Sequence, residues 1–263
     1  MSAAKTQAVP ALNSKVVLMF DGVIVIFNQP AGLMTVPHHC SEEVETLDRL
    51  TLDYPRAQDR GGKHNRSSRG VVHGIDKETS GFIVFARTFE AQQELSRKFR
   101  EHTIERRNFA IVHGRIKKQT ICSRLVRDAG DGLPGSACQG SVNDAGEELG
   151  RATVTNVEVV ESLDGATLVA CRIETGRIHH SRIHLSEVGH PIIGDKAYIR
   201  RSKEAIIPAY RVMLHEAELG FHHPILGESV KWTQPLPKDL RNRLKSLKIR
   251  VSEGKPDDNK ETK

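Results

Sequence analysis

Two polar segments that lie far apart in the chain carry residue types that can act together in catalysis. The segment 73–81 presents Asp76 directly before a short apolar run, and the segment 175–185 holds Arg177 and Arg182. A carboxylate on a loop can act as a nucleophile if it stays ionised in a partly dry site. A neighbouring arginine favours the ionised form and fixes its orientation. The alternative is that Asp76 caps a turn with nearby hydroxyl groups and that both arginines are surface charges.

Other catalytic chemistries have less support in the sequence. The 13 histidines include His180 and His184, which are four residues apart, but no HExxH arrangement or close cysteine pair accompanies them. The triplet Thr79-Ser80-Gly81 is not the Gly-x-Ser-x-Gly elbow of a serine hydrolase. Neither a GxxxxGK(S/T) loop nor a GxGxxG loop is present. We therefore expect no metal and no nucleotide cofactor.

The charge balance suits a polyanionic partner. The formal net charge is +6 and the isoelectric point is about 9.2. Neutralising phosphates releases counterions and adds affinity that does not depend on base sequence. Basic side chains concentrate in the loop 56–69 and in the region 87–118, where the candidate phosphate contacts are Arg60, Lys63, Arg66, Arg69, Arg106 and Arg107. The alternative for the loop is a solvated linker.

The start of the chain and the cysteines favour a cytoplasmic location. No apolar run is long enough to span a bilayer, and the first residues lack the apolar core of a secretory signal. The four cysteines are widely spaced, which argues against a disulfide framework and fits a reducing compartment. An organelle transit peptide has little support from the arginine-poor start, so an organelle is the secondary expectation.

Hydrophobic periodicity predicts the elements that must position these segments. Short β-branched and aromatic runs predict strands at 16–20, 23–27, 82–86 and 109–112, two strands within 151–173 around Asp164-Gly165, and a strand pair at 212–215 and 217–221. Apolar residues at helical spacing predict helices at 41–53, 89–101 and 238–251. The Asp21-Gly22 turn predicts that the first two strands form an antiparallel hairpin.

The chain reads as a single domain with flexible ends. Residues 1–14 are small and polar, and residues 252–263 are charged, so we expect disordered tails on both sides of a domain at 15–251. Residues 126–150 are rich in Gly, Asp, Ser and Ala, which predicts a long surface loop. The basic helix at 238–251 is expected to dock on the domain through its leucines.

Five segments, taken in order, resemble the motifs of the RluA-type pseudouridine synthases. Residues 26–33 are similar to a motif built around Asn-Lys-Pro-x-Gly, and residues 73–81 are similar to His-Arg-Leu-Asp-x-x-Thr-Ser-Gly. Residues 175–185 resemble Thr-Gly-Arg-x-His-Gln-Ile-Arg-x-His, and 189–198 with 214–224 complete the order. The resemblance covers roughly residues 16–240. It implies an α+β fold with a mixed, mainly antiparallel sheet, flanking helices and a central RNA-binding cleft.

The resemblance also implies an activity. The chain would isomerise uridine to pseudouridine in structured RNA, either rRNA or tRNA, with Asp76 as the nucleophile and Arg182 as its partner. No cofactor or metal would be needed, and the target base would be flipped into a pocket. The basic side chains above would contact the RNA backbone. The residues expected to bind the substrate are His73, Thr79, Gly81, Asn108, Arg177, His179 and His180.

Several motif positions depart from the family pattern. Gly74 stands in place of an arginine that helps to flip and hold the RNA, and Asn108 stands in place of a tyrosine that stacks on the base and is proposed as a base in a later step. An amide has no ring and does not titrate. Gln29 replaces a lysine, and His180-Ser181 replaces Gln-Ile. The alternative function is therefore a catalytically impaired RNA-binding or ribosome-assembly protein that retains the fold and has ribosomal assembly particles as partners.

The resemblance carries two further expectations. Only about 15 residues precede the first expected strand, so we expect no S4 RNA-binding domain in this chain. The motifs do not specify an oligomeric state or a membrane role, and we expect no membrane partner.

Overall fold

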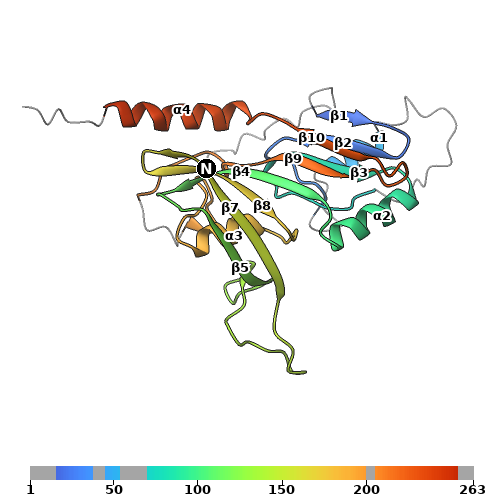
Figure 1. Cartoon of the computed structure of the whole chain (residues 1–263), viewed down its shortest axis with the longest axis horizontal. Coiled ribbons are helices and arrows are strands. Elements are labelled where there is room, and N and C mark those ends of the chain that lie inside the picture. The colour runs from blue at the N-terminus through green and yellow to red at the C-terminus, as the bar shows by residue number, and fades with distance from the viewer. Residues whose placement is uncertain (1–15, 38–44, 54–69, 200–204, 254–263) are drawn as a thin grey trace, which may run out of the picture.

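The structure is a computed structural model that describes residues 16–37, 45–53, 70–199 and 205–253 (Figure 1). Within these ranges the chain forms one mixed sheet with four helices. The strands are β1 (Val17–Phe20), β2 (Ile24–Gln29), β3 (Ser80–Ala86), β4 (Glu105–His113), β5 (Gln119–Val126), β6 (Gly135–Ser136), β7 (Arg151–Leu163), β8 (Ala166–Ile173), β9 (Leu214–His222) and β10 (Ser229–Thr233). The helices are α1 (Leu47–Asp53), α2 (Phe89–Arg100), α3 (His180–Glu187) and α4 (Lys238–Glu253).

The sheet has the order β1-β2-β3-β9-β4-β8-β7-β5-β6, with β10 added on β9. Every strand pairing in the described ranges is antiparallel except the pairing of β3 with β9, which is parallel and short. In that pairing Ser80 lies opposite His215 and Gly81 lies opposite Glu216. This one contact joins the β1-β2-β3 part of the sheet to the rest. The predicted mixed, mainly antiparallel sheet is confirmed.

Helices cover the sheet through the apolar stripes that the sequence predicts. Thr88 begins α2, because its hydroxyl accepts a hydrogen bond from the backbone of Ala91 at 3.1 Å. The buried Ala91 and Leu95 then pack against β2, β3 and β9. α4 buries Leu240, Leu244 and Leu247 in the core of β4, β7 and β8, which confirms the predicted docked helix.

The expected hairpin at the start of the chain is present. β1 and β2 pair in antiparallel register, and the Asp21 carboxylate accepts hydrogen bonds from the backbone of Val23 and Ile24 at 2.6 and 2.7 Å. β7 and β8 likewise pair around the Asp164-Gly165 turn. Together β5 and β7 form an arm that extends away from the rest of the sheet (Figure 1).

The expected strand pair at 212–215 and 217–221 is wrong. The structure has one continuous strand, β9, across both segments. A charged residue, Glu216, interrupts the apolar pattern, so the pattern predicts two strands instead of one. In the fold Glu216 is a buried strand residue, 6% exposed. Its burial, rather than a turn, explains the break in the pattern.

Other expectations match the structure in part. The helix expected at 41–53 is described as α1 from Leu47, and the helix expected to end at 251 continues to Glu253. The loop 126–150 is mostly exposed but contains the short strand β6. The expected tail at 1–14, the basic loop 56–69 and the part of the expected tail that follows Glu253 lie outside the described residues.

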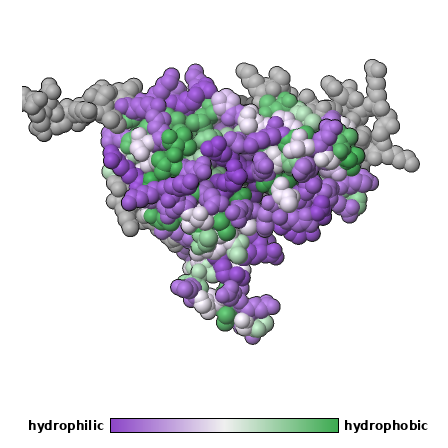
Figure 2. Space-filling model, in the orientation of Figure 1, coloured by the Kyte–Doolittle hydropathy of each residue, from purple (hydrophilic) through white to green (hydrophobic). Residues whose placement is uncertain are grey.

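The surface of the described residues carries both polar and apolar side chains (Figure 2). Figure 2 shows a mostly hydrophilic face on which hydrophobic side chains form separate patches. No helix within the described ranges is both long enough and apolar enough to cross a membrane.

The close approach of β3 to β9 generates a testable prediction. Gly81 has φ = 131°, and a Cβ there would lie 2.2 Å from the carbonyl oxygen of Glu216. We expect Gly81→Ala to lower the free energy of unfolding by about 2–4 kcal/mol, because it adds both strain and a clash with backbone. Urea denaturation measures the change. In the control Gly22→Ala, a Cβ would meet nothing within 4 Å, and an equal loss in both variants would contradict the prediction.

Candidate active site

A cleft of about 700 Å³ opens where the two polar segments meet. The loop before β3 contributes residues 72–79, and the segment around the start of α3 contributes residues 176–182. The floor includes side chains from β4 and β9. The two segments identified from their chemistry are therefore brought together in one cleft.

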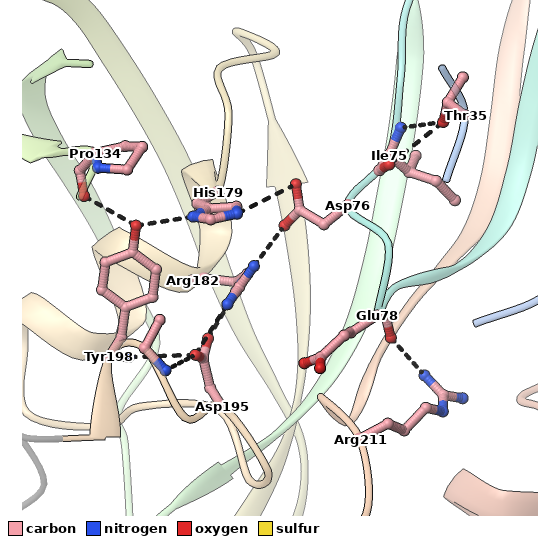
Figure 3. Close-up of polar contacts among 11 residues, drawn as sticks. Thr35, Ile75, Asp76, Glu78, Pro134, His179, Arg182, Asp195, Tyr198 and Arg211 are labelled. Carbon is pink, nitrogen blue, oxygen red and sulfur yellow. Dashed lines mark hydrogen bonds and ion pairs between the residues drawn. The ribbon is translucent and has the colours of Figure 1, made fainter. Parts of the chain in front are cut away.

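Asp76 and Arg182 form an ion pair across this cleft (Figure 3). The Nη1 atom of Arg182 donates to Oδ2 of Asp76 at 3.2 Å. Asp76 does close a turn, but through its backbone carbonyl, which accepts from the Thr79 backbone at 2.9 Å. The carboxylate itself is directed at Arg182, so it is not used as the turn cap.

A second carboxylate anchors Arg182 from behind. Asp195, which is almost fully buried, accepts from Nε of Arg182 at 2.7 Å and from Nη2 at 3.0 Å. The same carboxylate accepts from the backbone of Ala197 and Tyr198. Burial alone would lower the pKa of Arg182, but the two carboxylates raise it overall. Arg182 therefore stays cationic in a fixed, bidentate geometry.

His179 forms another side of the site. It has a left-handed backbone (φ = 58°) at the start of α3, and its Nδ1 lies 2.9 Å from the hydroxyl of Tyr198. Because that hydroxyl donates to the Pro134 carbonyl, Nδ1 of His179 must be the donor to it. Its Nε2 is 4.0 Å from Oδ1 of Asp76. The ring is thus held beside the carboxylate (Figure 3).

Two of the predicted binding histidines are held neutral by their surroundings. Burial, followed by the charge of Arg106, lowers the pKa of His73 to about 3. The Nε2 atom of His73 accepts from the Val84 backbone at 3.1 Å, and its ring stacks on Phe99. Burial, followed by the charge of His184, lowers the pKa of His180 to about 3. Both rings line the cleft without carrying a proton charge at neutral pH.

The remaining predicted residues are placed differently. Thr79, Asn108 and Arg177 line the cleft. Gly81 is not among its lining residues; its lack of a side chain is needed for the β3–β9 approach. At Gly74 the nearest atom to an added Cβ is the Thr35 hydroxyl at 3.6 Å, which is ordinary contact. Space therefore does not explain why this position lacks a side chain.

The candidate RNA-backbone residues also divide. Arg106 lines the cleft, and its guanidinium carbon lies 5.5 Å from the centre of the Phe99 ring, which is within the range of a cation–π contact. Arg107 lies outside the lining and pairs with Glu218 at 3.2 Å and with Glu158 at 3.8 Å. Arg60, Lys63, Arg66 and Arg69 lie outside the described residues.

Sequence reasoning did not identify two residues that support the site, Asp195 and Tyr198, or two arginines that act on Arg177 but do not line the cleft. Arg127 and Arg151 lie at the two ends of the 126–150 loop, and their positive charges act on Arg177, whose pKa is lowered first by burial and then by these two arginines. Asp195 and Tyr198 lie within the motif segment 189–198, but the sequence alone does not indicate a role for either residue. The sequence shows that Arg177 lies in a segment dense in polar and charged residues. Arg127 and Arg151 come near Arg177 because β5 pairs with β7, and the sequence does not show this pairing.

The described residues contain no group of three or more His, Cys, Asp or Glu side chains able to hold a metal ion. The polar groups of the cleft are instead a paired carboxylate, arginines, neutral histidines and amides. This set suits an uncharged, hydrogen-bonding heterocycle attached to phosphates better than it suits a cation.

Comparisons with known proteins identify the family of this chain. A family model described as RNA pseudouridylate synthase matches residues 23–187. "Ribosomal large subunit pseudouridine synthase D" of Zymomonas mobilis is 33% identical over 235 residues, which is 87% of this chain and 71% of that protein. "Dual-specificity RNA pseudouridine synthase RluA" of Escherichia coli is 33% identical over 84% of this chain and 92% of that protein.

A solved structure shares the fold. "Human RNA Pseudouridylate Synthase Domain Containing 4" superposes with a TM-score of 0.65 at 21% identity and covers 89% of this chain and 93% of its own. The chain belongs to the RNA pseudouridylate synthase family, and it is an RluA-type member. The predicted family, fold class and activity, isomerisation of uridine in RNA, are confirmed at this level.

The anchoring of Arg182 generates a second prediction. Asp195→Asn removes the charge that holds the guanidinium, so we expect kcat to fall by about 100-fold through misplacement of the ion pair, with little change in RNA affinity. Single-turnover kinetics and RNA binding measure the two effects. Asp21→Asn is the control, because Asp21 also accepts two backbone hydrogen bonds but lies in the β1–β2 turn. A loss of RNA affinity equal to the loss of kcat would contradict a positioning role.

Proposed function

We propose that Asp76 is the nucleophile of this pseudouridine synthase, that Arg182 is its charge partner, and that the substrate is a structured rRNA or tRNA. The observation that carries the proposal is the 3.2 Å contact between Asp76 and an arginine that Asp195 anchors inside the cleft. The fixed arginine pairs with the Asp76 carboxylate and keeps it directed into the site. The names of relatives such as ribosomal large subunit pseudouridine synthase D support rRNA as the first substrate to test.

The cleft suits a flipped nucleotide. Its volume of about 700 Å³ lies within the range of sites that hold small organic molecules. Extruding a base costs roughly a few kcal/mol, which contacts to phosphates offset. Asp76 then attacks the base or the sugar, the bond from N1 to C1′ breaks, the uracil turns, and a bond from C5 to C1′ forms.

The second candidate is an RNA-binding or ribosome-assembly protein that retains the fold. Gly74 and Asn108 support it, because neither supplies the side chain expected at its motif position. The complete chain from Asp76 through Arg182 to Asp195 supports the enzyme instead, because a buried charge network of this kind is costly to maintain. The proposed location is the cytoplasm, with an organelle as the alternative.

The third prediction tests the nucleophile. We expect Asp76→Ala to abolish pseudouridine formation, because no product forms without the attacking carboxylate. Chemical mapping of pseudouridines in the RNA of the source cell measures this, with a gene deletion complemented by each variant. Asp164→Ala, in the exposed β7–β8 turn, is the control and should restore the site. If deletion removes no site, or Asp76→Ala restores it, the proposal fails; rescue of growth by Asp76→Ala without any modified site would favour the assembly protein.

The fourth prediction concerns the arginines that approach Arg177. We expect Arg151→Gln to weaken RNA binding and to reduce the slope of log affinity against log salt by about one unit, because one phosphate contact is lost. Filter binding at several salt concentrations measures the slope. Lys245→Gln on the exposed face of α4 is the matched change of charge. Equal slopes for the two variants would show that Arg151 makes no phosphate contact.

A further inference from the structure

Glu216 is a buried acid that the roles above do not use. It lies in β9, is 6% exposed and lines the cleft. Its Oε2 atom has no hydrogen-bond partner among the described residues. A buried carboxylate oxygen without a partner is costly, so a free oxygen facing a substrate cleft calls for a functional explanation.

Strand pairing fixes where this carboxylate can reach. Glu216 lies opposite Asn108 of β4 and opposite Gly81 of β3. Its carbonyl accepts from Nε2 of Gln234 at 3.2 Å. The backbone is therefore held on both sides, and the side chain stands on the cleft floor beside Asn108, whose Oδ1 also has no partner.

The reaction needs a proton acceptor at the place where the new bond forms. Once C5 of the uracil is bonded to C1′, it still carries its hydrogen, and pseudouridine forms only when that proton leaves. Asp76 is paired with Arg182. His73 uses Nε2 to accept from a backbone group, and both ring nitrogens of His180 contact threonine oxygens. These three groups are poorly placed to take the proton.

We propose that Glu216 is the base that removes the C5 proton in the last step of the isomerisation. This inference rests on the proposed function of Asp76. Glu216 takes the proton from C5, the electron pair of the C–H bond forms the C5–C6 double bond, and the electrons of the N1–C6 double bond move to N1. N1 gains a proton from water, and Glu216 returns its own to water. The net change is an isomerisation without any co-reactant.

The charges around Glu216 suit this role. Burial raises the pKa of the Glu216 carboxyl, and the negative charge of Asp76 raises it further. The positive charge of Arg106 and a hydrogen bond from Asn108 act in the opposite direction. A carboxylate with a raised pKa is a stronger base than an exposed one, and its pKa lies nearer the working pH. Asn108 therefore supports the ionised form of Glu216, although it cannot take a proton itself.

The test uses RNA whose uridines carry deuterium or hydrogen at C5. In Glu216→Gln we expect single-turnover product formation to slow by about 100-fold or more, and to become several-fold slower with deuterium than with hydrogen. The larger isotope effect arises because proton removal becomes rate-limiting. Glu218→Gln is the matched control in the same strand; Glu218 pairs with Arg107 and does not line the cleft, so its rate and isotope effect should equal those of the unmodified chain.

Each outcome separates this inference from the proposed function. If Glu216→Gln stays within about threefold of the unmodified chain while Asp76→Ala is inactive, Glu216 is not the base and the proposed function stands. A slow Glu216→Gln with an unchanged isotope effect also rejects the base. An active Asp76→Ala rejects the proposed function and this inference with it. If Glu216→Gln fails to fold, Glu216→Asp replaces it in the same experiment. The shorter side chain moves the carboxylate away from C5, so we expect a slower reaction and a larger isotope effect. An unaltered rate in Glu216→Asp rejects Glu216 as the base.

Discussion

The site depends on one buried cation shared by two carboxylates. Arg182 uses Nε and Nη2 to hold Asp195 and uses Nη1 to hold Asp76. Burying such charges is expensive, and removing one partner of a buried pair is more damaging than replacing the whole network. Asp195 accepts hydrogen bonds from the backbone of Ala197 and Tyr198. These contacts fix Asp195, which fixes Arg182, and Arg182 in turn holds the Asp76 carboxylate in place. The Asp76 carboxylate is thereby oriented although it lies on a loop.

A second constraint is the short parallel contact between β3 and β9. It places the loop that ends at Ser80 beside the strand that carries Glu216, and Gly81 permits the backbones to approach. Arg211 strengthens the junction, since it donates to the carbonyls of Val212 and Leu214 and to the hydroxyl of Ser80. The loop that carries Asp76 and the strand that carries Glu216 are therefore both attached to the β3–β9 pairing. Functional side chains are held more precisely when rigid elements of the fold support them.

The sequence predicts much of this arrangement, for identifiable reasons. Asp76 and Arg182 lie in segments rich in polar residues next to clear apolar patterns. The sequence therefore indicates both the chemistry of these two residues and the secondary-structure elements beside them. The sequence pattern predicts two strands where β9 is continuous, because the buried acid Glu216 interrupts the run of apolar residues. The grouping of Arg127 with Arg151 depends on the pairing of β5 and β7 across a long loop, and such contacts leave no local signal. Asp195 was within a motif, but only the folded geometry reveals its bond to Arg182.

The departure at Asn108 has a different meaning once the fold is known. A reaction step requires a positioned proton acceptor, not a particular residue type at a particular place in the chain. β4 and β9 lie side by side in the cleft floor as paired antiparallel strands, and Asn108 on β4 lies opposite Glu216 on β9. An acceptor lost from one strand can thus be supplied by its neighbour without moving the backbone. A sequence motif that covers one strand does not show that Glu216 can take over a function lost at position 108. The two residues are adjacent in space but 108 positions apart in the chain.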